Sequence, residues 1–218
     1  MCIRYESVHD RNRLHQYFGM DLPLRLSHSD VWPGKPSPFI RGGHGATGRI
    51  RREALIGSFG LVPRWAVDTQ IARHAYNARC ESVDTKPNFR EAWERAQHCI
   101  IPLEAFFEPD WRTGTLLPAR IGQANGAPLG AAGLWSEWKD NNGELLYSFA
   151  LLTVNADADP LMNLLRKPSD EKRMLVILPP ERYDDWLAAD TRQSKRLLRL
   201  WPVELSVMDH KTMSMTLH

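Results

Sequence analysis

The second residue of this 218-residue chain is a cysteine, and that position offers a chemistry that an internal cysteine lacks. Removal of Met1 would leave Cys2 with a free α-amine and a thiol in the same residue. Such an amine titrates near pH 8, so about 10% of it is neutral and nucleophilic at pH 7. It can attack an aldehyde to give an imine, which the thiol closes to a five-membered thiazolidine. Position alone favours a plainer interpretation, in which Cys2 is a small buried apolar residue at the start of a strand.

The other two cysteines give no sign of a disulfide framework or of a zinc site. The total of three is odd, and no Cys-x-x-Cys pair occurs. We expect Cys80 and Cys99 to be inert core thiols. The sequence therefore implies no metal ion and no organic cofactor.

Composition is that of an ordinary soluble globular protein, with 43% hydrophobic and 25% charged residues. No apolar run reaches the length of a membrane span, and charged residues near the N-terminus exclude a signal-peptide core. We expect a cytoplasmic, nucleoid-associated protein that does not bind membranes. The net charge of +2 does not by itself indicate a nucleic-acid binder, although a local basic groove is compatible with it.

The first helix is expected near the start, where Asp10 can cap a segment that carries Leu14 and Phe18 on one face and ends at Gly19. The next stretch, residues 21–48, is rich in Pro, Gly, Ser and His. This composition predicts a long ordered loop.

Two further helices are indicated by their first residues. Asn88 and Glu91 form a plausible capping pair, and Asp159 is followed by proline at the first helical position. Strand-like runs occur at residues 54–62, 98–103, 117–123, 129–138, 145–155 and 174–178. Asn125-Gly126 and Asn142-Gly143 predict hairpin turns, and thus an antiparallel meander over residues 117–155. The fold class is therefore α+β, a mostly antiparallel, barrel-like sheet with peripheral helices, in one domain spanning residues 1–218.

Five segments in this order carry a resemblance to a known family. They are Met1-Cys2-Ile3-Arg4-Tyr5, Phe59-Gly60-Leu61-Val62-Pro63-Arg64-Trp65, Tyr76-Asn77-Ala78-Arg79-Cys80-Glu81, Ala105-Phe106-Phe107-Glu108-Pro109-Asp110-Trp111, and Leu161 through Lys172-Arg173-Met174. The set resembles the SRAP (SOS response-associated peptidase) family, whose members crosslink to abasic sites in single-stranded DNA. The resemblance covers Cys2 to about Trp186.

The resemblance implies that Cys2, freed of Met1, forms a thiazolidine with the ring-opened abasic sugar. Family members usually have glycine in the next position, whereas this chain has Ile3. The difference is mild if the Ile3 side chain points into the core. Asn77 matches the family's active-site asparagine, whose amide can both donate and accept hydrogen bonds. A loop-capping asparagine is the alternative.

Several positions are implied to contact DNA. Arg79 lies two residues beyond Asn77, so both side chains leave the same face of an extended segment, and its guanidinium can hold a phosphate. Arg4 matches a second phosphate-contacting position. Trp65 and Pro33 match an aromatic residue and a proline that lie against the neighbouring bases. The alternatives are solvated surface arginines and a core tryptophan.

Glu108 and Arg166 are the remaining candidates for the chemistry. Glu108 stands in an apolar run, where desolvation raises the pKa of a carboxyl group towards neutral, as a proton-transfer group requires; a solvent-facing glutamate is the alternative. Arg166 occupies a position where the family has a histidine associated with sugar activation and crosslink reversal. Arginine stays protonated and cannot shuttle a proton, so we expect capture to persist while later steps are slowed or altered. His74 is a weaker candidate to replace that histidine.

The sequence thus predicts a monomeric DNA-repair protein of the SOS response that forms a covalent, protective adduct with abasic sites in single-stranded DNA. The expected roles are Cys2 as nucleophile, Glu108 as general acid and base, Asn77 as positioning group, and Arg4, Arg79 and Arg166 as phosphate contacts. The imine also permits weak lyase activity by β-elimination. Two alternatives stay open: a cysteine-dependent peptidase that removes its own Met1, and a non-covalent binder of single-stranded DNA that has lost the chemistry.

Overall fold

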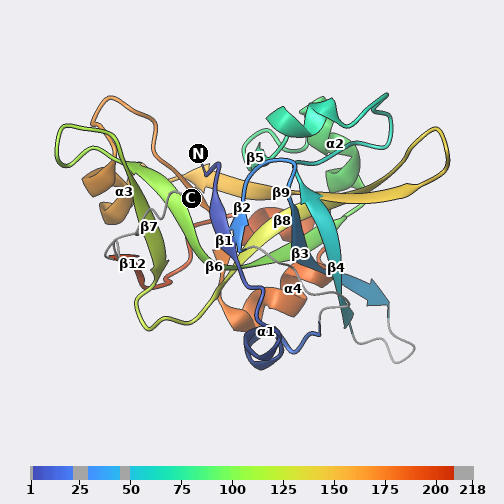
Figure 1. Cartoon of the computed structure of the whole chain (residues 1–218), viewed down its shortest axis with the longest axis horizontal. Coiled ribbons are helices and arrows are strands. Elements are labelled where there is room, and N and C mark those ends of the chain that lie inside the picture. The colour runs from blue at the N-terminus through green and yellow to red at the C-terminus, as the bar shows by residue number, and fades with distance from the viewer. Residues whose placement is uncertain (1, 22–28, 45–49, 209–218) are drawn as a thin grey trace, which may run out of the picture.

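The computed structural model describes residues 2–21, 29–44 and 50–208, and its strands join into one continuous sheet (Figure 1). The strands are β1 (Tyr5–Ser7), β2 (Asp30–Val31), β3 (Pro36–His44), β4 (Ile50–Phe59), β5 (Asn77–Arg79), β6 (His98–Asp110), β7 (Leu117–Gln123), β8 (Leu129–Lys139), β9 (Leu145–Asn155), β10 (Arg173–Leu175), β11 (Ile177–Leu178) and β12 (Leu205–Met208). The helices are α1 (Arg11–Phe18), α2 (Pro87–Glu94), α3 (Pro160–Leu165), α4 (Tyr183–Ala188) and α5 (Thr191–Leu197), with short 3-10 helices η1 (Gln70–His74) and η2 (Pro180–Arg182).

Five of these strands close into a barrel. Each of β8, β9, β4, β3 and β6 pairs with the next, and β6 pairs back onto β8. All these pairs are antiparallel except the short β4–β9 contact. The predicted α+β fold with a mostly antiparallel, barrel-like sheet is confirmed.

Strand β6 is longer than the barrel requires, and this extension positions the candidate site. Its first half pairs with β8 as far as Leu103, whereas Phe106 to Asp110 pair with β7. The β1 strand pairs with the middle of β6, with Tyr5 opposite Phe106. The N-terminal segment is thereby held beside the part of β6 that carries Glu108.

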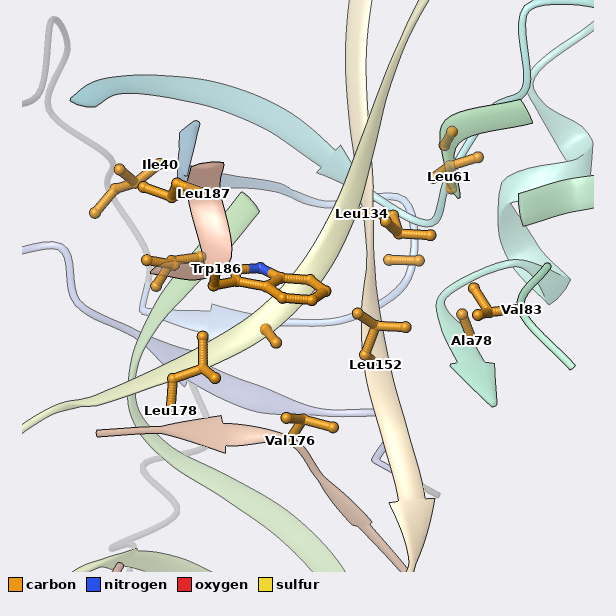
Figure 2. Close-up of a cluster of buried hydrophobic side chains, with 14 of the residues drawn as sticks. Ile40, Leu61, Ala78, Val83, Leu134, Leu152, Val176, Leu178, Trp186 and Leu187 are labelled. Carbon is orange, nitrogen blue, oxygen red and sulfur yellow. The ribbon is translucent and has the colours of Figure 1, made fainter. Parts of the chain in front are cut away.

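Buried side chains form two clusters on opposite faces of the sheet, because neighbouring strand residues alternate between them. One cluster is covered by α1, α2 and α4, and Figure 2 shows Trp186 within it. The Trp186 indole N–H donates to the Cys99 carbonyl at 2.9 Å. The other cluster contains Phe39, Phe59, Phe149 and Cys2. The candidate nucleophile therefore belongs to a packed core.

The prediction of a long loop over residues 21–48 is wrong for the residues that the structure describes. Residues 22–28 and 45–49 of that stretch lie outside the described residues, but β2 and β3 occupy much of the rest. Strand β3 contains Pro36 and Pro38, which lie two residues apart, so the backbone nitrogen atoms of both point to the same edge of the strand. On that edge β6 pairs only with Ile40 and Arg41, so neither proline removes a ladder hydrogen bond.

The predicted meander over residues 117–155 is correct only for its second turn. Asn142-Gly143 joins β8 to β9, which pair along most of their length, whereas β7 pairs with β6 and β12 instead of β8. The Asn88–Glu91 capping pair is also wrong, because α2 begins at Pro87 with Lys86 as its N-cap. Asp10 and Asp159 do cap α1 and α3, as predicted. Within the described residues, every helix is too short or too polar to cross a lipid bilayer.

Candidate active site around Cys2

Cys2 lies just before β1, in a position fixed by the pairing of β1 with β6. The Arg4 carbonyl accepts a hydrogen bond from the Phe107 N–H at 3.0 Å and another from the Cys2 thiol at 3.2 Å. Cys2 is fully buried, and burial together with the nearby Glu108 carboxylate raises the pKa of its thiol to about 12. The thiol is therefore protonated at neutral pH. Ile3 is 46% exposed, so its side chain does not point into the core, and the condition under which its difference from glycine would be mild is not met.

Asn77 contacts Cys2 although the two residues are 75 positions apart in the chain. It is the first residue of β5, which lies parallel to β9, and its side-chain N–H donates to the Cys2 carbonyl at 2.6 Å. Its side-chain oxygen is buried and accepts no hydrogen bond from any described residue. The amide thus fixes the Cys2 backbone and leaves an acceptor available beside it. The loop-capping alternative does not apply, since Asn77 lies in a strand.

Glu108 and Arg166 form a buried ion pair at the same site. The Glu108 carboxylate lies on the extended part of β6, and the Arg166 guanidinium at the end of α3 is 3.0 Å away. The Glu108 side chain is 1% exposed and that of Arg166 is 12% exposed. Burial raises the pKa of Glu108, and the Arg166 guanidinium opposes part of that rise. The solvent-facing alternative for Glu108 is therefore wrong, and the carboxyl group is placed to exchange protons.

Arg4 is held in a fixed orientation at the edge of the site. Its guanidinium lies 2.7 Å from the Asp30 carboxylate and stacks over the Phe107 ring at 4.1 Å. The indole N–H of Trp32 donates to the same carboxylate at 3.1 Å, and Trp32 is 43% exposed. Neither Asp30 nor Trp32 could be predicted as a partner of Arg4 from the sequence, because they approach it only through the β1–β2 pairing.

Arg79 lies on β5 and, like Asn77, alternates with the buried Ala78. Its guanidinium pairs with the Glu171 carboxylate at 3.0 Å, and about half of its side chain is exposed. The sequence did not indicate Glu171, which is 92 residues away in the chain. Arg79 is thus accessible, and it lies two residues along β5 from Asn77, which contacts Cys2; its role as a phosphate contact stays a prediction.

Trp65 and Pro33 lie on the surface. Trp65 lies in a turn that follows the bend at Gly60, whose φ of +115° favours glycine. The indole N–H of Trp138 donates to the carbonyl of Ala66, the residue after Trp65. Trp65 is 54% exposed, so the core alternative for this tryptophan is wrong. Pro33 lines an open groove of about 660 Å³ that also exposes Lys35 and Arg73. His74 is exposed at the end of η1.

A model of the family described as SOS response associated peptidase (SRAP) matches residues 1–216. This chain belongs to the SRAP family. The matched range includes all the candidate residues described above.

Similar proteins of known sequence and structure agree with this placement. The chain is 33% identical to two proteins of Bacillus subtilis (strain 168), named abasic site processing protein YoqW and abasic site processing protein YoaM. Each match covers 59% of this chain and 54% of the relative, so the chain matches about half the length of these relatives. A crystal structure of a Bordetella bronchiseptica protein superposes with a TM-score of 0.83 at 38% identity, covering 94% of this chain and 97% of the other. A Bacteroides thetaiotaomicron protein shares the fold, with a TM-score of 0.72 at 20% identity over 90% and 86% of the two chains.

The candidate site of this chain is assembled from four segments that are distant in the sequence. The structure brings together Cys2, Asn77, Glu108 and Arg166, and it places Arg4 and Arg79 at the surface around them. Within the described ranges, no group of three or more His, Cys, Asp or Glu residues is arranged to hold a metal ion.

Proposed function

We propose that the protein processes abasic sites in DNA by capturing the sugar aldehyde on Cys2, in single-stranded DNA, as a stable thiazolidine. Membership of the SRAP family supports this function, as do relatives named abasic site processing proteins. The observation that carries the proposal is the surroundings of Cys2. Cys2 is buried beside Glu108, whose carboxyl pKa is raised by burial, and beside Asn77, whose side-chain oxygen accepts no hydrogen bond from a described residue.

The proposed reaction begins with the α-amine of Cys2, after hydrolysis of the Met1–Cys2 peptide bond. Met1 itself lies outside the described residues. The amine nitrogen bonds to the aldehyde carbon, and the carbonyl oxygen gains the proton that the amine loses. Glu108 in its acid form then protonates the resulting hydroxyl group, which leaves as water and gives a protonated imine, with Glu108 left as a carboxylate.

The thiol completes the ring in the second stage. Because the Cys2 thiol has a pKa of about 12, it does not compete as a thiolate for the free aldehyde. Its sulfur bonds to the carbon of the protonated imine, whose nitrogen becomes the neutral ring N–H, and the thiol proton passes to the Glu108 carboxylate formed in the previous step. The sum is aldehyde plus aminothiol giving thiazolidine plus one water, and Glu108 returns to its starting form. The imine also permits slow strand cleavage by β-elimination, which would be a weak lyase activity.

Asn77 and Arg166 have supporting roles in this proposal. Asn77 holds the Cys2 carbonyl at 2.6 Å and offers its free oxygen to a sugar hydroxyl or to the attacking amine. Arg166 stabilises the Glu108 carboxylate at 3.0 Å but cannot transfer a proton at neutral pH. Reversal of the crosslink should consequently be slow. An Arg166→His variant that reverses no faster than the parent protein would contradict this assignment.

The DNA contacts follow from exposure and charge. Arg4 and Arg79 are proposed to hold the phosphates on either side of the lesion, because both present guanidinium groups at the rim of the site. Trp65 is proposed to stack on a neighbouring base, and Pro33 to exclude continuing duplex. Single strands suit this arrangement, since an abasic sugar must leave the helix to reach a buried nucleophile.

A cysteine peptidase is less well supported. Amide hydrolysis needs a thiolate, whereas burial holds the Cys2 thiol in its protonated form. No hydrogen bond between described residues joins Cys2 to a histidine that could activate it.

The test is a denaturing gel of the processed protein with an oligonucleotide that carries one abasic site. We expect a shifted band that survives denaturation and requires the abasic site. Cys2→Ala should abolish the band, whereas Cys99→Ala, which truncates another fully buried cysteine in the same core cluster, should retain it. Retention of DNA binding without any covalent band would favour the non-covalent binder instead.

A further inference from the structure

A cluster of three charged residues next to the site suggests how the affinity for undamaged DNA is kept low. Arg79 pairs with Glu171 at 3.0 Å, and Arg173 pairs with the other oxygen of the same carboxylate at 3.0 Å. Glu171 thus lies between two guanidinium groups that differ greatly in exposure. The Arg79 side chain is 48% exposed and the Arg173 side chain is 4% exposed.

Arg173 holds Glu171 in place. Its guanidinium also pairs with the Glu81 carboxylate at 2.8 Å and donates to the Thr153 carbonyl at 2.7 Å. These contacts fix the buried arginine independently of Arg79. Glu171 is therefore anchored from the protein side, while its contact with Arg79 faces solvent.

Arg79, unlike Arg173, is not anchored by several partners within the described part of the chain. Among the described residues, Glu171 is the partner that its guanidinium contacts, through both of its terminal nitrogens. A guanidinium binds carboxylate and phosphate with the same two-pronged geometry, so a carboxylate in this place occupies the position of a phosphate. Since Arg79 lies two residues from Asn77 on β5, that phosphate would be one next to the lesion.

We propose that Glu171 is a competitor for the DNA backbone, which must be displaced from Arg79 before a strand can occupy the site. The inference rests on the proposed function, because it concerns the same DNA. Its consequence is specificity: an intact strand dissociates readily, whereas an abasic strand is retained by the covalent bond. Removing the Glu171 charge should strengthen binding of intact single strands.

The test measures the dissociation constant of an intact, labelled single-stranded oligonucleotide by fluorescence anisotropy. Glu171→Gln should bind about two- to fivefold more tightly than the parent, which is the range expected for an exposed ion pair. Asp170→Asn is the matched control, because it removes the same charge from the adjacent residue, which has no contact with Arg79. Thermal unfolding of each variant establishes that it is folded.

The Arg79→Ala background separates direct competition from general repulsion of DNA. If Glu171 acts through Arg79, the gain from Glu171→Gln disappears in this background. An equal gain with Asp170→Asn, or a gain that persists without Arg79, would overturn the inference while leaving the proposed function intact. Weaker binding by Glu171→Gln would also overturn it, since Glu171 would then orient Arg79 for DNA. Failure of both the parent and Glu171→Gln to bind any single strand would overturn the inference and the proposed function together.

Discussion

Replacing Arg166 with glutamine should make the stability of the protein depend on pH more strongly than it does in the parent. The Arg166 guanidinium lies 3.0 Å from the Glu108 carboxylate, whose side chain is 1% exposed. An opposite charge at this range lowers the pKa of a carboxyl group by about 1–3 units. Each unit corresponds to about 1.4 kcal/mol, so the variant should lose about 1.4–4 kcal/mol when Glu108 is ionised.

The sign follows from the direction of the shift. Burial already raises the pKa of Glu108 above its usual value, and loss of Arg166 raises it further. A group with a raised pKa in the folded state favours folding while it is protonated, and that contribution is lost as the pH rises through the folded-state pKa. The loss of stability in Arg166→Gln should therefore be small at pH 5 and large at pH 8.

Urea unfolding at these two pH values measures the effect. Arg182→Gln is the matched control, because Arg182 pairs with Asp185 at 2.8 Å but both side chains are about half exposed. That variant should lose at most about 1 kcal/mol at either pH. Equal losses at pH 5 and pH 8 for Arg166→Gln would refute the assignment of Arg166 as the counter-charge of Glu108.

Three further predictions concern the elements that position the site. Asn77→Ala should slow crosslinking about 100-fold while leaving the affinity for intact single-stranded DNA unchanged, because it releases the Cys2 carbonyl; equal losses in rate and affinity would contradict this role. Gly60→Ala should cost about 1–3 kcal/mol in urea unfolding, since a Cβ at this positive φ would collide with the Ala72 carbonyl oxygen; a variant as stable as the parent would show that the turn relaxes. Trp65→Ala should weaken single-strand binding by about 1–3 kcal/mol, as measured by anisotropy, with unfolding changed by less than about 0.5 kcal/mol, and unchanged binding would exclude stacking.

The parts of the fold that could be predicted from sequence are those with local signals. The bounds predicted for β7 and β9 are confirmed, because both strands carry β-favouring runs bounded by turn residues. The caps at Asp10 and Asp159 were recognisable because their signal lies in neighbouring residues, although the same kind of signal misplaced the start of α2 at Asn88. Predictions from the sequence were wrong where the structure of a segment depends on which strands pair with it. Pro36 in β3 is tolerated only because β6 leaves that edge unpaired, which no local pattern reports.

The same distinction applies to the candidate site. Residues implied by the family resemblance do come together, although Asn77 is 75 residues from Cys2 in the chain. What the sequence could not supply is the partner of each charge. Asp30 at Arg4 and Glu171 at Arg79 lie 26 and 92 residues away, and no local pattern distinguishes them from other surface acids. The burial of Glu108, by contrast, was foreseeable from its apolar neighbours.

Mass spectrometry of the adduct formed with an abasic oligonucleotide tests the central claim most directly. The account predicts a species whose mass is that of the protein without Met1 plus the oligonucleotide minus one water. Digestion should place the oligonucleotide on the peptide that begins at Cys2, and the bond should be stable without a reducing agent. An adduct on a lysine, or one that survives only after reduction, would contradict capture by Cys2 as a thiazolidine.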